Sequence, residues 1–286
     1  MTGLTGSAAP PAEPAFRQVR LTHLGGPTVL IEVDGWRLLT DPTFDAPGRR
    51  YSFGWGAFSR KTDGPAIAPA DLGRIDAVLL SHDQHGDNLD RMGRAVLGSS
   101  GVVITTTAGA RRLGGNATGL APWTATTLSA PDRGDLEVTA TPCRHGPPFS
   151  RPITGDAIGF AMRSSPTGSS AIWISGDTVL YDGVRSIAGR IHVDIAVIHL
   201  GAVQFPVTGP FRYTMTALDA VELCALLRPR VVIPVHYEGW RHFHESRTSI
   251  EREFADAPAD IARSLLWLPI GSPTDIRPAP EQMTFR

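Results

Sequence analysis

The sequence is poor in the features that would signal secretion or membrane insertion. Among 286 residues there are only two cysteines, Cys143 and Cys224, which are too few for a disulfide framework and fit a reducing compartment. No apolar run approaches the length of a bilayer span, and the first residues lack the charged start and apolar centre of a secretory signal. We therefore expect a cytoplasmic protein without a membrane span.

The chain also lacks a surplus of charge of either sign. Its 27 basic residues nearly balance its 28 acidic ones, the net charge is −1, and Lys61 is the only lysine. Because affinity for nucleic acids depends largely on neutralising phosphates with basic side chains, no nucleic-acid partner is expected. The hydrophobic fraction of 42% is ordinary for a globular protein, and this composition leaves open whether the chain forms a homo-oligomer.

The order of apolar and polar residues predicts an α/β fold. Residues 1–15, rich in Gly, Ala and Pro, are expected to be a disordered tail ahead of a single domain at 16–286. Three strands are predicted first, then strands and helices in alternation, with an amphipathic helix at 216–227, a polar helix at about 245–254 and a last strand at 265–268. This pattern favours two mixed β-sheets packed face to face with helices outside.

A long irregular stretch at 43–69 interrupts this pattern. It contains Tyr51, Phe53, Trp55 and Phe58 among glycines. Loops of this length are usually functional or form lids, although the aromatic residues could equally pack as a satellite cluster with no part in the chemistry.

The most informative stretch is the octapeptide SHDQHGDN at 81–88. It follows an apolar strand and precedes residues with helical spacing, so we place it on the turn between them. Its imidazole and carboxylate groups, His82, His85 and Asp87 among them, suit a divalent, zinc-like metal. Asp87 or Asn88 could instead cap the helix that follows.

Other metal-capable side chains also follow apolar strands. His145 comes after 138–142, Asp177 after 171–175 and His236 after 230–235. A lone histidine at a strand end is more often structural, and His199 is interpreted in this way because no partner can be identified. Repetition of one context by several groups favours a shared metal site at one edge of the sheets.

At this point the sequence resembles the metallo-β-lactamase fold superfamily. The residues that carry the resemblance are THLGGPTVLIE at 22–32, LTDP at 39–42 and the octapeptide, and it extends to about Phe243. The sequence looks most like the branch of ascorbate-phosphate lactonases and N-acyl-phosphatidylethanolamine phospholipase D-like hydrolases. The resemblance implies a four-layer αββα sandwich. It also implies metal ligands: His82, His85 and His145 for a first ion, Asp87 and His236 for a second, and Asp177 bridging both.

Two departures from the family motif, His-x-His-x-Asp-His, bear on the metal. Gln84 is an extra residue between the first two histidines, and Asn88 occupies the place of the last one. One or two divalent ions therefore remain open. Zinc is expected, with manganese, iron or magnesium as alternatives, because an amide oxygen suits harder ions.

Neighbouring residues are candidates to shape the site. His23 and Asp41 fall near the metal edge in the family layout, and His23 is expected to donate to a ligand carboxylate. Tyr237, Trp240 and His242 follow His236 and are predicted to form a pocket wall. An equal alternative is that Trp240 only anchors the loop.

These observations predict a metal-dependent hydrolase of a small or lipid-like ester, lactone or phosphodiester. A bound divalent ion would lower the pKa of water, Asp177 would orient the resulting hydroxide, and Asp87 would serve as proton acceptor. A nuclease of the same fold is the alternative enzyme. A non-catalytic binding module is the alternative from another class, and Gln84 and Asn88 are the features that support it.

Overall fold

The computed structural model describes residues 16–164 and 170–277, so the predicted tail at 1–15 lies outside the described residues. Seven strands form the first sheet, in the order β15-β1-β2-β3-β6-β7-β8. Their bounds are Val19–Gly25 (β1), Thr28–Val33 (β2), Trp36–Thr40 (β3), Ala77–Leu79 (β6), Val102–Thr106 (β7), Ala117–Leu120 (β8) and Thr274–Ile276 (β15). The first three strands and β15 pair antiparallel, whereas β3, β6, β7 and β8 run parallel.

The second sheet has six strands in the order β14-β13-β12-β11-β10-β9. They span Ala125–Ala130 (β9), Arg133–Pro142 (β10), Ile158–Arg163 (β11), Ala171–Ile174 (β12), Val193–His199 (β13) and Val231–Val235 (β14). Strands β12, β13 and β14 are parallel, and the others are antiparallel. Both sheets are therefore mixed, as predicted.

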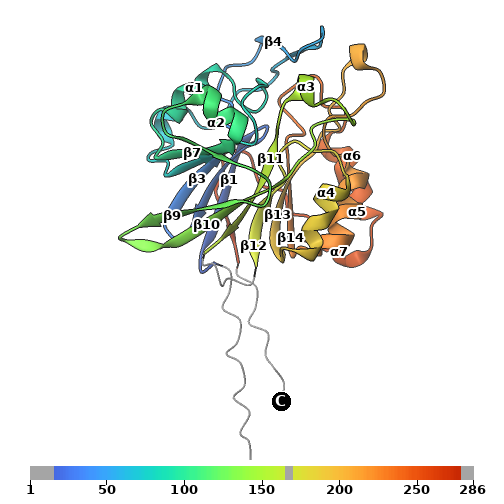
Figure 1. Cartoon of the computed structure of the whole chain (residues 1–286). Helices are drawn as coiled ribbons and strands as arrows, with labels where there is room; N and C mark the ends of the chain where they lie inside the picture. Colours follow the sequence, from blue (N-terminus) through green and yellow to red (C-terminus); the bar gives the residue numbers. More distant parts are fainter. Residues whose placement is uncertain (1–15, 165–169, 278–286) are drawn as a thin grey trace, which may run out of the picture.

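Helices cover the outer faces of both sheets (Figure 1). The α-helices are Arg91–Leu97 (α1), Thr107–Leu113 (α2), Arg151–Thr154 (α3), Asp182–Arg185 (α4), Ala217–Leu227 (α5), Arg247–Ala255 (α6) and Ala259–Ser264 (α7). Short 3-10 turns span Pro69–Asp71, Ser186–Gly189 and Pro206–Thr208. Helix α5 begins with the capping box that Thr216 and Asp219 form, in which each side chain accepts a backbone N–H of the other residue.

Three apolar clusters account for the layers. Leu21, Ile31, Val138 and Ile195 belong to the cluster that both sheets share between them. A second cluster joins the outer face of the second sheet to α5, α6 and α7, and a third joins the outer face of the first sheet to α1. The four-layer αββα sandwich expected from the sequence is therefore confirmed, because each sheet buries one face in the centre and the other under helices.

The segment 43–69 is not simply irregular. It contains a two-stranded sheet, Arg50–Ser52 (β4) with Phe58–Arg60 (β5), and stands at the same end of the sandwich as α3 (Figure 1). Lys61 holds the segment to the start of α1, since its Nζ lies 2.9 Å from Asp90 Oδ2 and both side chains are buried. Asp90 also caps α1 by accepting the N–H of Gly93.

The predicted last strand at 265–268 is wrong. Leu265 makes an isolated bridge to Val232 and the chain then leaves the sheet. The N–H of Leu266 still donates to Val232 O at 2.8 Å, and residues 266–268 form no strand. The strand that closes the first sheet is β15, which the sequence reading missed.

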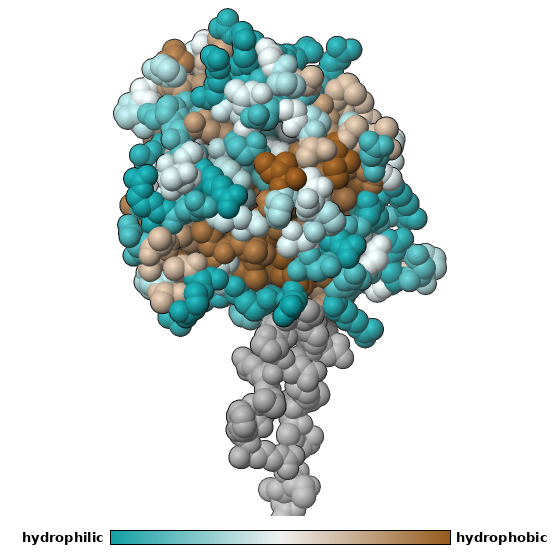
Figure 2. All heavy atoms as spheres, turned by 180° about the vertical axis from the view of Figure 1, so that it is seen from behind, coloured by the Kyte–Doolittle hydropathy of each residue, from teal (hydrophilic) through white to brown (hydrophobic). Residues whose placement is uncertain are grey.

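Seen from behind, the surface is mostly hydrophilic, and the apolar side chains that reach it gather mainly in a band across the lower part of the molecule (Figure 2). None of the helices within 16–164 and 170–277 combines the length and apolar character needed to cross a membrane.

Candidate metal centre

Strand direction brings the candidate ligands to one edge of the sandwich. Strands β3 and β6 are parallel, so Asp41 and the octapeptide at 81–88 emerge at the same edge of the first sheet. In the second sheet β10 points the same way as β12, β13 and β14, so the residues that follow these strands also meet at one edge. These residues are His145 after β10, Asp177 after β12, His199 ending β13 and His236 after β14.

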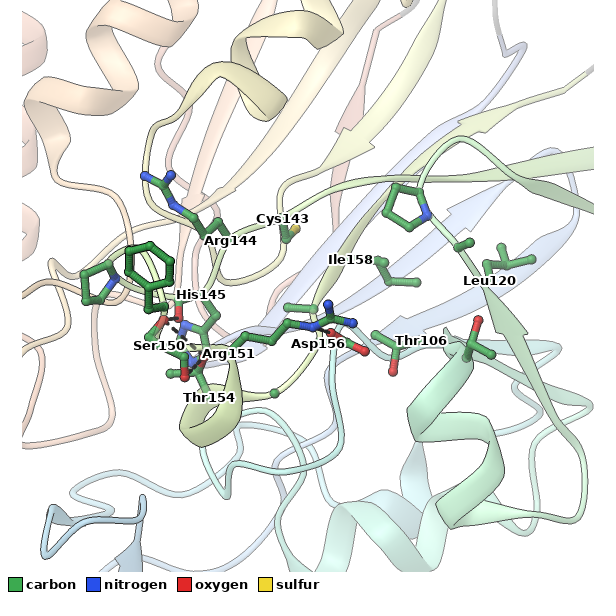
Figure 3. Close-up of a pocket in the computed structure, with 17 residues that line it drawn as sticks. Thr106, Leu120, Cys143, Arg144, His145, Ser150, Arg151, Thr154, Asp156 and Ile158 are labelled. Carbon is green, nitrogen blue, oxygen red and sulfur yellow. Dashed lines mark hydrogen bonds and ion pairs between the residues drawn. The ribbon is translucent and has the colours of Figure 1, made fainter.

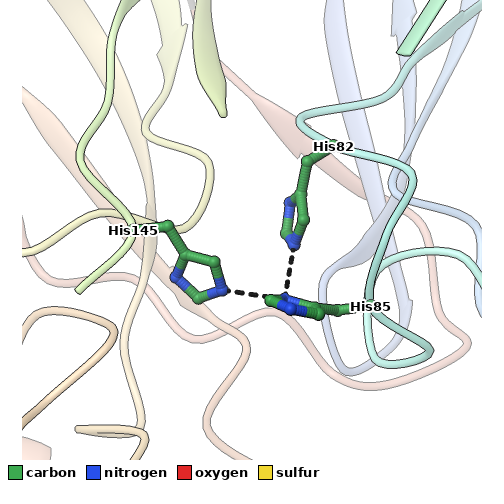
Figure 4. Close-up of side chains that lie close together, drawn as sticks. All are labelled: His82, His85 and His145. Atoms are coloured by element: carbon green, nitrogen blue, oxygen red, sulfur yellow. Dashed lines mark hydrogen bonds between the residues drawn. The ribbon is translucent and has the colours of Figure 1, made fainter. Parts of the chain in front are cut away.

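Three histidines form the first cluster. His85 Nδ1 lies 3.1 Å from His82 Nε2 and 3.0 Å from His145 Nε2, and all three side chains are buried. Figure 4 shows that His145 comes from the second sheet and faces the two histidines of the octapeptide. The extra residue Gln84 does not separate them, because its exposed side chain points away and packs against Gly155.

One hydrogen bond in this cluster fixes which ring nitrogen of His145 keeps a lone pair. A carbonyl oxygen can only accept, so the Nδ1–H of His145 donates to Tyr213 O at 2.8 Å and its Nε2 is left as an acceptor. Burial and then the neighbouring histidines lower the pKa of His85 to about 4 and that of His82 well below its usual value. Neutral imidazoles with converging lone pairs fit a divalent cation.

A second cluster holds carboxylates and His236. His236 Nε2 lies 3.5 Å from both Asp87 Oδ2 and Asp177 Oδ2, and it has no hydrogen-bond partner among the described residues. Burial would raise the pKa of Asp177, but His236, His199 and His145 outweigh it and hold that pKa below its usual value. Burial would likewise raise the pKa of Asp87, but the nearby His236 ring and the hydrogen bond with His242 outweigh it and hold that pKa well below its usual value.

A positive charge is therefore favoured in this second cluster. Burial alone would lower the pKa of His236, but the carboxylates of Asp177 and Asp87 have the larger effect and raise that pKa to about 9. Without a metal ion, the positive charge in this cluster is therefore the proton on His236. Two carboxylate oxygens and one imidazole nitrogen that converge in a buried site also suit a divalent ion.

Asn88 can serve this cluster in two orientations. In one, Nδ2 donates to Ser81 Oγ at 3.3 Å and the amide oxygen faces the carboxylates. In the reverse orientation, Nδ2 donates to Asp177 Oδ2 at 3.1 Å and to Asp87 Oδ1 at 3.3 Å. The second orientation satisfies the hydrogen bonds without a cation, whereas the first aims an oxygen where a cation would be held.

His199 is the functional neighbour that sequence reasoning missed. The Nδ1–H of this buried ring donates to Asp177 Oδ1 at 2.8 Å, so His199 positions the proposed bridging carboxylate rather than being merely structural. The signal was available, because β13 lies between β12 and β14 and its end must lie beside Asp177 and His236.

Asp41 lies beside His199 and is more than a turn residue. Its Oδ1 accepts the N–H of Ser81 at 2.7 Å, which ties the octapeptide to β3. Burial first, and then Asp177, raise the pKa of Asp41 well above its usual value. Its Oδ2 lies 3.8 Å from His199 Nε2, and neither atom has a hydrogen-bond partner among the described residues.

The other predicted neighbours divide into one close contact and three supports. His242 Nε2 lies 2.8 Å from Asp87 Oδ2, and its Nδ1 lies 2.6 Å from Ser59 Oγ. The expected bond from His23 to a ligand carboxylate is wrong, because His23 Nε2 bonds to Gly26 O at 2.9 Å. The same oxygen, Gly26 O, accepts the N–H of His236 at 2.9 Å. His23 therefore helps to hold the backbone of the candidate ligand His236.

Tyr237 and Trp240 pack against other rings. Tyr237 contacts Trp267 edge-on, with ring centroids 5.1 Å apart, and belongs to the cluster under the helices. Trp240 is buried in a cluster with Phe53 and packs on Tyr51 at 4.9 Å, so it anchors the loop after His236, as the alternative interpretation held, and joins that loop to the 43–69 segment.

Two cavities flank the segment 143–154, and His145 lines both. One, of about 560 Å³, is drawn in Figure 3 and holds Arg144, Arg151 and Asp156. The other, of about 480 Å³, has His85 and Asp87 beside His145 and is otherwise lined mostly by apolar side chains. We call the latter the apolar chamber.

Three known proteins that are similar to this chain are named as hydrolases. A metal-dependent hydrolase of Caldivirga maquilingensis is 23% identical over 253 residues, which cover 84% of this chain and 96% of that protein. Among solved structures, a possible metal-dependent hydrolase of Veillonella parvula has a TM-score of 0.75 at 17% identity, covering 91% of this chain and 99% of that one. An isothiocyanate hydrolase from Delia radicum gut bacteria has a TM-score of 0.73 at 21% identity, covering 91% and 100%.

The family itself is established by a match over most of the chain. The sequence model described as "Beta-lactamase superfamily domain" matches residues 36–237, which include all the candidate ligands described above. The narrower branch expected from the sequence stays a prediction. With the αββα fold and the converging histidines and carboxylates in place, the chain belongs to the β-lactamase superfamily, as a metal-dependent hydrolase.

Proposed function

We propose that this centre hydrolyses a small or lipid-like ester, lactone or phosphodiester with the help of one or two divalent ions. The observation that carries the proposal is the convergence of His82, His85 and His145, whose ring nitrogens lie 3.0 to 3.1 Å apart in a buried site. These histidines would hold a first ion, with zinc expected. Asp87 and His236 would hold a second, Asp177 would bridge, and Asn88 would offer its amide oxygen.

The ions, when bound, would lower the pKa of water and stabilise negative charge that develops on the substrate. The protein groups have their own tasks. Asp177, which His199 holds through Oδ1, keeps Oδ2 directed into the site and would orient the attacking water. Asp87 would accept a proton from that water. Its low pKa makes it pass the proton on rather than retain it, and the leaving oxygen takes up a proton as its bond breaks.

His242 supports this role of Asp87. In the neutral ring, the Nε2–H of His242 donates to Asp87 and Nδ1 accepts from the Ser59 hydroxyl. Burial lowers the pKa of His242, which favours this neutral form. The carboxylate is therefore held in one orientation without a second charge at that position.

Two adjacent residues provide a matched test. His85→Ala removes a proposed ligand, whereas Gln84→Ala changes the exposed neighbour that points away from it. We would measure metal content by elemental analysis, together with hydrolysis of para-nitrophenyl butyrate, dihydrocoumarin and bis(para-nitrophenyl) phosphate. The proposal expects His85→Ala to lose metal and every activity, and Gln84→Ala to keep both.

The same measurements separate the alternatives. About two equivalents of metal in the wild type would mean that Asn88 or water completes the second site, and about one would mean a mononuclear enzyme. No metal, and no uptake of added zinc, manganese or iron, would instead favour a non-catalytic module. Cleavage of RNA without activity on the small substrates would favour a nuclease.

A further inference from the structure

The apolar chamber differs in character from every other part of the candidate site. Its walls come from three segments: the β4–β5 turn with Phe53 and Ala57, the α3 region with Ile153, and the stretch 203–213 with Val203 and Phe205. Among the described residues no arginine or lysine lines it, and its ionisable side chains are Tyr213 and the site residues His85, Asp87 and His145. The charged groups therefore lie at one end, where the chemistry is proposed.

The mouth of the chamber is apolar as well. Four of the lining residues are large apolar side chains that remain largely exposed: Trp55 (75%), Phe149 (97%), Val207 (57%) and Phe211 (53%). Exposed apolar residues that rim an apolar cavity are typical of a ligand site, since scattered ones would not share one opening.

The rings inside the chamber are held in place. Phe53 and Phe205 contact each other with centroids 5.1 Å apart, and His242 packs on both, at 4.8 and 5.0 Å. Because His242 also bonds to Asp87, the inner wall is tied to a proposed ligand. Gly54 lies close to Ile153, because a Cβ built on this glycine would lie 3.4 Å from Ile153 Cγ2.

Two arginines near the site, Arg144 and Arg151, line the neighbouring cavity instead of the apolar chamber. Figure 3 shows Arg144 and Arg151 in that cavity, where Arg151 pairs with Asp156 and Arg144 stacks on Tyr181 at 4.6 Å. Away from the end where the metal is proposed, a carboxylate or phosphate in the apolar chamber would lose its hydration without gaining a basic partner among the described residues that line it. Charge would thus be excluded there, and an apolar group would be admitted.

We propose that the apolar chamber is the specificity site for the arm of the substrate next to the scissile bond, and that this arm is uncharged and apolar. The substrate class is then a neutral acyl or aryl ester or lactone rather than one with an anionic arm. This inference rests on the proposed hydrolysis at the adjacent metal centre. It adds which chemical groups of the substrate the apolar chamber accepts.

A matched pair of substrates tests the proposal. Para-nitrophenyl pentanoate and the para-nitrophenyl monoester of glutaric acid have the same chain length and differ in a terminal methyl or carboxylate. In both, water adds to the carbonyl carbon and the bond to the nitrophenol oxygen breaks. We expect kcat/KM of the metal-loaded wild type to favour the pentanoate by at least about tenfold.

Introduced charge should abolish or reverse this preference. Ile153→Lys places a flexible cation on the wall, and we expect it to reduce the preference about tenfold or more. Val207→Lys at the exposed mouth is a second variant that the fold tolerates more readily, and it should shift the ratio in the same direction. Leu218→Lys on the outer helix α5 is the matched control, because it adds the same charge at an exposed apolar position outside the chamber.

Binding without turnover distinguishes failure of this inference from failure of the proposed function. We would compare pentanamide with glutaramate, its carboxylate analogue, by saturation-transfer NMR. If no ester is hydrolysed but pentanamide binds selectively and Ile153→Lys inverts the selectivity, the chamber assignment stands and ester hydrolysis falls. If both esters are hydrolysed equally by the wild type and by Ile153→Lys and Val207→Lys, or if neither amide binds, the chamber assignment is overturned.

Discussion

Replacing Lys61 by Met should destabilise the protein out of proportion to the size of the change. Lys61 is the only lysine, and only 4% of its side chain and none of that of Asp90 is exposed. Removing the ammonium leaves the Asp90 carboxylate buried without its counter-charge, a change that typically costs about 3–5 kcal/mol. Asp90 would still accept the N–H groups of Asp45 at 2.6 Å and Gly93 at 2.8 Å, so we expect the lower end, about 3 kcal/mol.

The assay is chemical denaturation followed by tryptophan fluorescence, supported by thermal melting. A loss of about 3 kcal/mol corresponds to a drop in melting temperature of roughly 6–12 °C for a domain of this size. Arg60→Met is the matched control, because it removes a positive charge from the adjacent, exposed position and should change stability by no more than about 0.5 kcal/mol. Equal effects of the two variants would refute the reasoning, since the cost would then not come from the buried pair.

This prediction also bears on the apolar chamber. Lys61 directly follows β5 in the 43–69 segment, which places Phe53 and Ala57 in the chamber wall. The contact between Lys61 and Asp90 fixes this segment to the start of α1. If the anchor matters for function, Lys61→Met should raise KM for the neutral ester more than it lowers kcat, because the wall is loosened while the proposed ligands keep their places. Arg60→Met should leave both constants unchanged.

Three further predictions concern the metal centre. A chelator should lower the melting temperature of the wild type but not that of His145→Ala. Ions that bind only the folded state stabilise it, by about 2.7 kcal/mol when their free concentration is a hundred times Kd. Equal shifts in the two proteins would argue against the site. His242→Ala should reduce kcat/KM roughly 10- to 100-fold with metal content unchanged, as measured by elemental analysis, since it orients Asp87 without being a proposed ligand. Asn88→His should shift the preference of the second ion from manganese towards zinc in competition dialysis, and an unchanged preference would mean that residue 88 is not a ligand.

The sequence was sufficient to predict that most of the candidate ligands converge, because the signal is local. Each apolar strand identifies its own end, and His145, Asp177 and His236 all occupy such ends. Strands that share a direction and a sheet must then bring those ends together, which is why the convergence could be predicted without coordinates. The same argument holds for His199, because it ends β13, which lies between β12 and β14 both in the chain and in the sheet.

Other features could not be predicted, because they depend on contacts between distant segments. Nothing around Lys61 indicates that it is buried, since its partner Asp90 is 29 residues away and belongs to another element. The pairing of β15 with β1 joins the two ends of the described chain, and single-sequence periodicity carries no information about such pairing. Likewise, the direction of Gln84 follows from its packing against Gly155, which is remote in sequence.

The sheet edge that carries the candidate ligands also concentrates buried polar atoms without hydrogen-bond partners. Among the described residues, three of the six buried side-chain polar atoms without a hydrogen-bond partner, Asp41 Oδ2, His199 Nε2 and His236 Nε2, lie at this one place. Each such atom is costly to bury, so a fold shaped only by stability would have replaced them with apolar groups. Their concentration beside Asp177 supports the proposed function, for which His236 is a candidate ligand and His199 positions Asp177. The two departures from the family motif are compatible with this function, because Gln84 turns outward and the amide of Asn88 can present oxygen or nitrogen to the same carboxylates.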